Sequence, residues 1–326
     1  MSLSNKRILV TGGAGFIGST LVRKLVENAN EVYVLDNLSS GYESNVILDE
    51  SVKFYNGDVR DESLVANLVK ESDVIFHLAE FIPNTEKYGA GHVVKFSVEN
   101  PLAEFDVSCR GTLTVLEKAK EYKRRLIFAS TAAVYGEANT AYIKEVHETL
   151  PISPYGASKL CAETYVKLYQ RIYELPTTIL RLFNVYGPKQ RKYVMYDILR
   201  KLAINPYELE VLGTGYEERD FIYVDDVIDA LLMVAENEDT AGQIFNVGSG
   251  EATSLRDLVK TMMEVLVLNP KIVFTNSSWK GNVRRLCADI TRIGELGFKP
   301  KYQLRAGIES LTNWFFSLHK TDCQNT

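Results

Sequence analysis

A glycine-rich stretch, TGGAGFIGS at residues 11–19, constrains this chain more than any other feature. It follows an aliphatic run at residues 8–10, which is typical of a strand buried on both faces. Gly12, Gly15 and Gly18 fit a strand-to-helix turn in which side chains would block the approach of a ligand to the backbone. Free amides at a helix N-terminus attract anions, so the turn predicts a bound pyrophosphate.

A second predicted strand, at residues 31–37, ends in an acidic residue about 20 positions after the glycines, as dinucleotide-binding folds require. Asp36 is placed there to accept hydrogen bonds from a ribose diol. Its negative charge would repel a 2′-phosphate, which favours NAD over NADP as the cofactor. The alternative for Asp36 is a turn residue at a strand end, and turn chemistry alone can also produce the glycine pattern.

The composition excludes several classes of protein. Of the 326 residues, 46% are hydrophobic and 24% are charged, as in a globular protein, and the net charge of −5 gives no reason to expect nucleic-acid binding. No run approaches the roughly 18 apolar residues of a membrane span, and no signal peptide is evident. The four cysteines lack the close pairs of metal sites, so we expect no metal and a reducing, cytoplasmic setting.

Apolar strands alternate with amphipathic stretches through the first half of the chain, which predicts an α/β fold with a Rossmann-type, doubly wound parallel sheet. Helical periodicity is clear at residues 102–122, and Ser254 is a candidate N-cap for a helix that follows it. The predicted strands are RILVT, EVYVLD, VKFYN, DVIFHLA, RRLIFAS and TTILRLFN.

Glycine, charge and tyrosine become frequent in the loops after Asn184, where we place a smaller, C-terminal substrate-binding domain. Residues 1–184 are assigned to the nucleotide-binding domain, and 225–248 are expected to return to it. The substrate-binding domain then comprises residues 185–224 and 249–326.

Two residues of the segment PYGASK can carry acid-base chemistry. Tyr155 and Lys159 are four apart, hence on one face of a helix that starts near Pro154. An ammonium beside a phenol favours the phenolate, so Tyr155 is a candidate general base. The spacing is also common on ordinary helices. Upstream, Ser130 and Thr131 end a predicted strand, where a hydroxyl could pass a proton or hold a substrate oxygen, or simply bond to backbone.

Several ordered motifs, from Lys6 to about Leu304, resemble those of the extended short-chain dehydrogenase/reductase family, and most closely its nucleotide-sugar 4-epimerases of the UDP-glucose 4-epimerase kind. The motifs are TGGAGFIGS, Asp36, GDVRD, HLA, STAAVYG, PYGASK, LRLFNVYGP and ERDFIYVDD.

The resemblance implies an NAD site spread over several strand ends. The glycines and the Phe16 and Ile17 amides would hold the pyrophosphate, and Lys159 would hold the nicotinamide ribose and tune Tyr155. The remaining implied contacts are Asp36 and Asn37 with the adenosine ribose, Asp58 and Val59 with the adenine, and Leu78 and Ala79 with the nicotinamide side.

The resemblance also implies a catalytic cycle. Tyr155 would take the proton of the sugar 4-hydroxyl, Thr131 would be its hydroxyl partner, and Asn184 and Arg219 would grip the diphosphate of the nucleotide sugar. Hydride would pass from carbon 4 to NAD and return to the other face of a 4-keto sugar. NAD should therefore stay bound. A surface ion pair is the alternative role for Arg219, and a homodimer built through helices at residues 102–122 and 157–173 is also implied.

The residues that follow Thr131 and the HLA motif bear on the reaction. Hexose 4,6-dehydratases of this scaffold carry an acidic residue or pair after the strand-end hydroxyl, whereas this chain has Ala132 and Ala133, which favours epimerisation. Against this, the usual HLAA is HLAE, which brings Glu80 to the nicotinamide pocket as a possible acid, base or substrate contact. It could equally be a salt-bridged loop residue. The segment at residues 81–101 is also lengthened and should reshape the sugar pocket.

A third departure lies in SWKGNVRR, where relatives often have Arg-x-Gly-Asp for the ribose and phosphate of the substrate. Trp279 and Asn282 replace the arginine and the aspartate, and Arg284 is a candidate for restoring the charge. A UDP-sugar is favoured over a GDP-sugar as substrate, with the base and the sugar left open.

Three functions follow. The first is a nucleotide-sugar 4-epimerase with tightly held NAD. The second is a nucleotide-sugar dehydratase of unusual regiochemistry that uses Glu80. The third, from another class, is a catalytically idle NAD-binding sensor or scaffold, against which the intact Thr131, Tyr155 and Lys159 argue.

Overall fold

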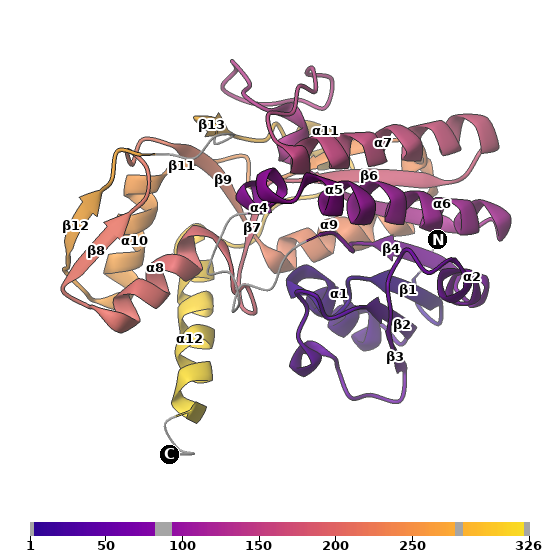
Figure 1. Cartoon of the computed structure of the whole chain (residues 1–326), viewed down its shortest axis with the longest axis horizontal. Coiled ribbons are helices and arrows are strands. Elements are labelled where there is room, and N and C mark those ends of the chain that lie inside the picture. The colour runs from indigo at the N-terminus through magenta and orange to yellow at the C-terminus, as the bar shows by residue number, and fades with distance from the viewer. Residues whose placement is uncertain (1–2, 82–92, 278–282, 323–326) are drawn as a thin grey trace.

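The computed structural model describes residues 3–81, 93–277 and 283–322. A seven-stranded parallel sheet has the strand order β10-β6-β5-β4-β1-β2-β3, which confirms the predicted doubly wound α/β fold (Figure 1). Its strands are β1 (Arg7–Thr11), β2 (Glu31–Asp36), β3 (Val52–Asn56), β4 (Val74–His77), β5 (Arg125–Thr131), β6 (Thr177–Leu182) and β10 (Ile244–Val247).

The order of the strands creates a crevice at their carboxyl ends. From β1 the chain passes to β2 and β3 on one side, then returns to β4 on the other side of β1. The loops after β1 and β4 therefore diverge, and ligands of such sheets bind between them. Strands β4 and β6 are buried along their whole length, which explains why apolar and β-branched residues dominate both. Their polar exceptions, His77 and Arg181, are buried with hydrogen-bond partners.

Helices cover both faces of this sheet (Figure 1). Apolar residues of α1 (Phe16–Glu27) and α9 (Val224–Glu236) form one core with one face of the strands. Those of α2 (Glu62–Glu71), α6 (Thr112–Glu121) and α7 (Pro154–Tyr173) form a second core with the other face. Residues 244–247, within the segment expected to return to the nucleotide-binding domain, pair with β6 as its outermost neighbour.

The region predicted as one helix at residues 102–122 is interrupted. It consists of α5 (Pro101–Phe105), a π-helical segment η2 (Asp106–Gly111) and α6, with α4 (Val93–Glu99) preceding them. A Cβ on Gly111 would lie 2.7 Å from Val59 Cγ2, so the missing side chain lets the chain pass close to the loop after β3. Turns of π-helix are frequent at functional sites, and this one borders the crevice.

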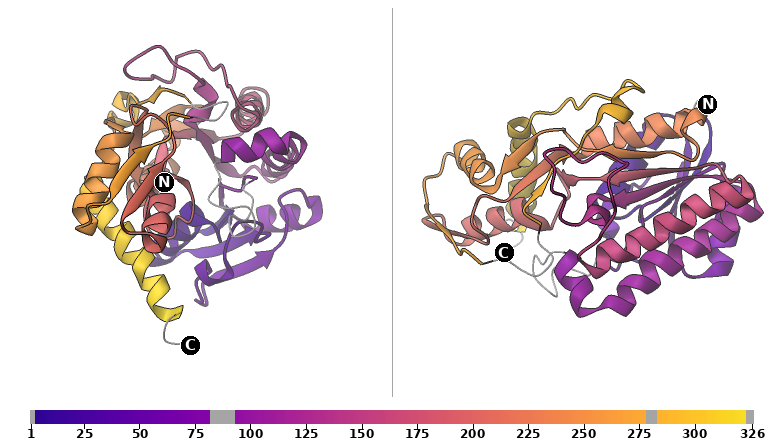
Figure 2. Two further views of the ribbon diagram at one scale, coloured as in Figure 1. Left: turned by 60° about the vertical axis from the view of Figure 1, so that its left-hand side comes forward. Right: turned by 90° about the horizontal axis from the view of Figure 1, so that it is seen from above.

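A smaller lobe lies beyond β7 (Figures 1 and 2). It holds a four-stranded sheet, in which β9 pairs with β7, β11 and β13, and a two-stranded sheet of β8 and β12. Ser254 caps α10 by accepting a hydrogen bond from the Asp257 amide, as predicted. The elements are β7 (Asn184–Tyr186), α8 (Tyr193–Ile204), β8 (Glu208–Val211), β9 (Glu218–Tyr223), β11 (Ala252–Ser254), α10 (Leu255–Leu266), β12 (Lys271–Phe274), β13 (Arg285–Leu286) and α12 (Leu304–Asp322). The short helix α11 (Thr291–Gly294) packs instead against β10 of the large sheet.

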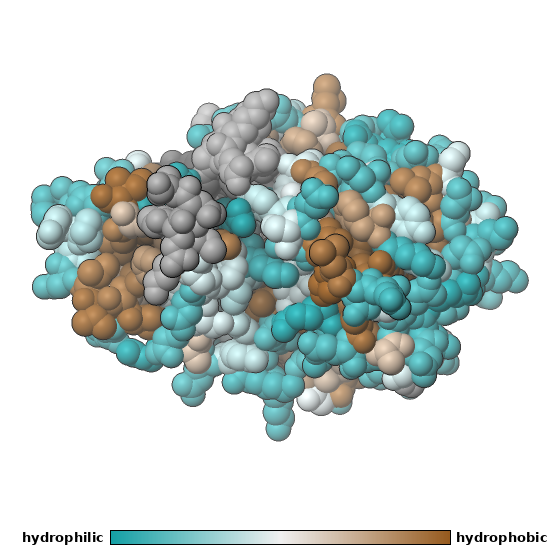
Figure 3. All heavy atoms as spheres, turned by 90° about the horizontal axis from the view of Figure 1, so that it is seen from below, coloured by the Kyte–Doolittle hydropathy of each residue, from teal (hydrophilic) through white to brown (hydrophobic). Residues whose placement is uncertain are grey.

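The surface is mostly hydrophilic on the face seen in Figure 3, with apolar residues gathered in a few patches. Among the helices of the described residues, none is long and apolar enough to cross a membrane.

Candidate active site

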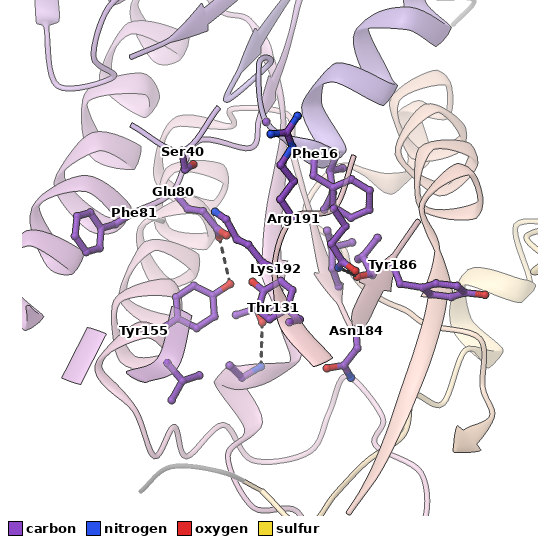
Figure 4. Close-up of a pocket in the computed structure, with 18 of the residues that line it drawn as sticks. Phe16, Ser40, Glu80, Phe81, Thr131, Tyr155, Asn184, Tyr186, Arg191 and Lys192 are labelled. Atoms are coloured by element: carbon purple, nitrogen blue, oxygen red, sulfur yellow. Dashed lines mark hydrogen bonds between the residues drawn. The ribbon is translucent and has the colours of Figure 1, made fainter. Parts of the chain in front are cut away.

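A cavity of about 840 Å³ lies at the carboxyl ends of the strands of the large sheet, between the two lobes (Figure 4). Its volume is at the upper end of the range usual for small-molecule sites. The glycine turn after β1 lines one arm, and residues of β7 and β9 line the other. The cavity can therefore receive two ligands that meet near Tyr155.

The glycine turn has the shape that a pyrophosphate requires. Gly12 has φ +73°, and a Cβ on it would lie 2.9 Å from the backbone nitrogen of Ala79. A Cβ on Gly18 would lie 2.1 Å from Gly12 O, so α1 can start this close to β1 only with glycine there. Gly15 is the N-cap of α1, and no side chain caps its first turn. The Phe16 and Ile17 amides at that helix start therefore suit an anion.

The acidic end of β2 lies beside this turn. Asp36 accepts hydrogen bonds from the Ala14 amide at 3.0 Å and the Leu38 amide at 2.8 Å, and burial raises the pKa of its carboxyl. Asn37 donates to Asp58 at 2.9 Å, and hydrogen bonds from Arg60 lower the pKa of Asp58 to about 2. The predicted adenosine-site residues thus lie together, and Val59, Leu78 and Ala79 line the same cavity.

The predicted acid-base residues also lie together, because α7 begins at Pro154 and is capped by Ser153. Tyr155 donates a hydrogen bond through its hydroxyl to Glu80 Oε2 at 3.2 Å. Lys159 is buried, donates to the Ala129 carbonyl at 2.7 Å, and lies 3.8 Å from the same Glu80 oxygen. Figure 4 shows Glu80, Tyr155 and Thr131 around one space.

The electrostatics of this group differ from the sequence-based expectation. Burial raises the pKa of Tyr155 well above its usual value, the charge of Glu80 raises it further, and a hydrogen bond with Thr131 acts in the opposite direction. Burial also lowers the pKa of Lys159, while Glu80 counteracts that effect. The Lys159 ammonium is directed at Glu80 and a backbone carbonyl. In this arrangement the protein itself therefore favours the neutral phenol of Tyr155.

Both hydroxyl residues at the end of β5 line the cavity, but the Ser130 hydroxyl is engaged by a buried carboxylate. The Ser130 hydroxyl donates to Glu163 at 2.6 Å, and Glu163 is held by a buried ion pair with Arg181 at 2.7 Å. Thr131 accepts a hydrogen bond from the Ala133 amide at 3.2 Å and lines the cavity. The neighbouring Ala132 also lines it, so no acidic side chain follows Thr131 in this wall.

The predicted substrate-side residues are only partly brought together. Asn184 and Arg219 line the cavity, where Asn184 donates to the Asp220 carbonyl at 3.2 Å. Arg219 donates to the Val283 carbonyl at 2.6 Å, and burial lowers the pKa of its guanidinium to about 10. Arg284 is not placed as expected, because its side chain is exposed outside the cavity lining. Asn282 lies outside the described residues, as does Trp279.

Three titratable residues near the site escaped the sequence analysis. Lys192 and Tyr193, the N-cap and the first residue of α8, line the cavity, and a run of basic residues just before this helix was their only sequence signal. Glu104 is fully buried, and burial raises its pKa to about 7. Its Oε1 accepts from Ser108 at 2.6 Å, whereas Oε2 has no partner within the described residues. No pattern in the sequence distinguishes Glu104 from a surface residue.

Among residues 3–81, 93–277 and 283–322, no cluster of three or more His, Cys, Asp or Glu side chains could hold a metal ion.

Comparison with known proteins places this geometry in context. A family model for NAD-dependent epimerases/dehydratases matches residues 8–248. The putative UDP-glucose 4-epimerase of Methanocaldococcus jannaschii is 37% identical over 321 aligned residues, which cover 96% of this chain and 100% of that protein. The UDP-glucose 4-epimerase of Thermotoga maritima, crystallised with UDP-glucose, superposes with a TM-score of 0.86 at 34% identity and covers 96% of this chain and 99% of its own.

A dehydratase is structurally as similar. The dTDP-glucose 4,6-dehydratase of Streptomyces venezuelae, crystallised with NAD, has a TM-score of 0.86 at 29% identity, covering 97% of this chain and 98% of its own. Overall similarity therefore does not distinguish epimerisation from dehydration. The side chains of the site have to distinguish them.

Proposed function

Because this chain belongs to the NAD-dependent epimerase/dehydratase family, we propose that it inverts the configuration at carbon 4 of the sugar in a nucleotide sugar. The substrate is a UDP-sugar rather than a GDP-sugar. Support for this choice comes from the similarity to UDP-glucose 4-epimerases over nearly the whole chain.

The residues of the site can carry out such a cycle. Bound NAD supplies a reversible hydride acceptor, so that carbon 4 passes through a planar ketone that has lost its configuration. Tyr155 removes the proton of the 4-hydroxyl and later returns one, with Thr131 holding the oxygen. Asn184 and Arg219 hold the diphosphate, which leaves the hexose free to turn over between the two halves of the reaction.

A charge change is needed for Tyr155 to act as a base, since burial and Glu80 both raise its pKa. The Lys159 ammonium can favour the phenolate of Tyr155 only if it acts more on Tyr155 and less on Glu80 once cofactor and substrate are bound. Glu80 therefore acts as a positioning residue that sets the proton affinity of Tyr155.

The observation that favours epimerisation is the wall that follows Thr131. It is formed by Ala132 and Ala133, which have no group that could protonate a leaving hydroxyl or abstract a proton from carbon 5. Elimination of water needs both steps, whereas epimerisation needs proton transfer only at the 4-oxygen.

The experiment is incubation of the purified protein with a panel of UDP- and GDP-sugars, followed by NMR and mass spectrometry. The proposal expects a stereoisomer of unchanged mass, formed more slowly, by about 100-fold or more, with Tyr155→Phe under the same conditions. A product lighter by one water molecule would assign the dehydratase reaction instead.

A dehydratase of unusual regiochemistry is the second candidate, favoured by the Glu80 carboxylate 3.2 Å from the Tyr155 hydroxyl. In that case Glu80 would supply the acid or base that the alanines after Thr131 cannot.

We further propose a homodimer. Residues Leu102 and Phe105 of α5 and Leu168 and Ile172 of α7 expose apolar side chains, and these two helices pack against each other. The spacing of Leu168 and Ile172 places both on one face of α7. A cytoplasmic location is proposed on the three free thiols of the described residues, Cys109, Cys161 and Cys287.

A further inference from the structure

The segment at residues 189–193, between β7 and α8, crosses the dinucleotide arm of the cavity from the smaller lobe. Lys189 Nζ donates a hydrogen bond at 3.3 Å to Ser19 Oγ, in the first turn of α1. The Arg191 guanidinium lies 4.0 Å from the centre of the Tyr42 ring, in the loop after β2. The segment is thus fastened on both sides of the glycine turn.

The backbone of this segment is held in an unusual shape. Lys189 has φ +72° and Tyr193 has φ +68°, both in the left-handed region that side-chain-bearing residues rarely adopt. Such conformations are unfavourable for residues with a Cβ and persist where surrounding contacts impose them. Neither position is glycine, so the contacts with Ser19 and Tyr42 and the packing of Tyr193 in the cavity impose a shape that local preference opposes.

Lys192 lies between Lys189 and Tyr193, the two residues with positive φ, and lines the cavity. Its side chain extends toward Glu80 in Figure 4. Burial lowers the pKa of its ammonium to about 8, and the charges of Glu80 and Asp36 counteract this. Asp36 ends β2 and Glu80 follows β4, and these strands flank β1. The contacts of Lys189 with Ser19 and of Arg191 with Tyr42 hold the Lys192 backbone near the end of β1, where the glycine turn begins.

We propose that Lys192 is a cofactor-binding residue that contacts the pyrophosphate of NAD on the side opposite the glycine turn. The turn offers neutral amides and a helix dipole, which leave most of the charge of the two phosphates uncompensated. A buried lysine facing them supplies one full positive charge in a setting of low dielectric constant. The contact would link the substrate-binding lobe to the cofactor and would help to retain NAD through successive turnovers.

The diphosphate of the nucleotide sugar is the competing ligand for this ammonium. The position of the segment favours the dinucleotide, because Lys189 and Arg191 contact Ser19 and Tyr42 on the two sides of the glycine turn. The residues expected to hold the sugar-nucleotide diphosphate, Asn184 and Arg219, belong to β7 and β9 in the other arm.

The test measures dinucleotide binding rather than turnover, so it is independent of which sugar is used. NADH and ADP-ribose are titrated into cofactor-stripped wild type, Lys192→Met and Lys192→Arg, with Lys260→Met, an exposed lysine of α10, as the matched control. UDP is titrated into the NAD-loaded forms, and circular dichroism verifies folding.

We expect Lys192→Met to weaken both NADH and ADP-ribose by tenfold or more, with UDP affinity within twofold of wild type. Lys192→Arg should keep most of the affinity, and Lys260→Met all of it. Unchanged NADH affinity in folded Lys192→Met overturns the proposal. So does a loss confined to UDP, which assigns Lys192 to the substrate, or a loss for NADH but not ADP-ribose, which assigns it to the nicotinamide ring, the part of NADH that ADP-ribose lacks. Failure of the epimerase assay alone has no bearing on these outcomes.

Discussion

Tyr155 donates a hydrogen bond to Glu80, and this contact places a negative charge against the residue expected to lose a proton. The same carboxylate lies 3.8 Å from Lys159, so the ammonium that should favour the phenolate is shared with Glu80. The proton affinity of Tyr155 therefore depends on three groups rather than on the tyrosine-lysine pair alone.

Replacing Tyr155 by Phe should reduce turnover by about 100-fold or more, because the ring remains but the proton acceptor is lost. Binding of the nucleotide sugar should change little. The measurements are steady-state kinetics and calorimetric titration of the substrate into the NAD-loaded variant. Near-normal turnover in this variant would exclude proton transfer through Tyr155.

Replacing Glu80 by Gln separates the two candidate reactions, since the amide keeps the shape and removes the charge. In an epimerase, turnover should stay within about tenfold of wild type, whereas in a dehydratase that uses Glu80 it should fall by about 100- to 10,000-fold.

The same variant should shift the pH profile. The Glu80 charge raises the pKa of Tyr155, so its removal lowers that pKa, and activity that depends on the phenolate should rise at a lower pH than in wild type. A profile of kcat/KM between pH 6 and 10 measures this. A shift toward higher pH would contradict the assigned role of Glu80.

Replacing Asp36 by Ala should weaken NAD binding by about tenfold or more and relax the discrimination against NADP, because the ribose diol loses its acceptor and a 2′-phosphate loses its repulsion. Calorimetry with both dinucleotides tests this, with Asp49→Ala, an exposed aspartate after η1 (Glu43–Asn45), as the control. Equal affinity of the wild type for NAD and NADP would refute the role of Asp36.

Glu104 should make folding stability depend on pH. Burial raises its pKa from about 4.5 to about 7, so the folded state favours the protonated carboxyl. The protonated Glu104 carboxyl therefore stabilises the folded state fully below pH 4.5, and this stabilisation is lost as the pH rises through 7. The shift corresponds to about 3 kcal/mol.

Relative to wild type, Glu104→Gln should therefore gain up to about 3 kcal/mol in free energy of unfolding between pH 4.5 and pH 8. Urea unfolding at several pH values measures the difference, with the exposed Glu99→Gln as the control. A difference that does not change with pH would show that folding does not raise the pKa of Glu104.

The combined substitution Leu168→Glu and Ile172→Lys should convert the proposed dimer to monomers. These side chains are 41% and 58% exposed in the single chain, and charges there would be costly to bury in an interface. Sedimentation velocity distinguishes the two states. A monomeric wild type, or a dimer that persists in the variant, would contradict a dimer interface formed by these residues of α7.

The sequence by itself determined the sheet, the glycine turn and the spacing of Tyr155 and Lys159. Each follows from a local cause: uninterrupted apolar runs require burial on both faces, glycines permit the turn at β1, and a four-residue interval places two side chains on one helical face. Asp36 belongs here too, because its position follows directly from the end of β2.

The folded structure was needed to show which polar groups face one another. Ser130 and Thr131 are adjacent, chemically alike and both line the cavity, yet Ser130 donates to Glu163 of the Glu163–Arg181 pair, whereas Thr131 lies beside Tyr155. Glu80 meets Tyr155 although 75 positions separate them, because strand order brings β4 beside β5 and under α7. Lys192 reaches the dinucleotide arm only because the segment before α8 crosses between the lobes. Such contacts depend on the packing of distant segments, and no local pattern in the chain encodes them.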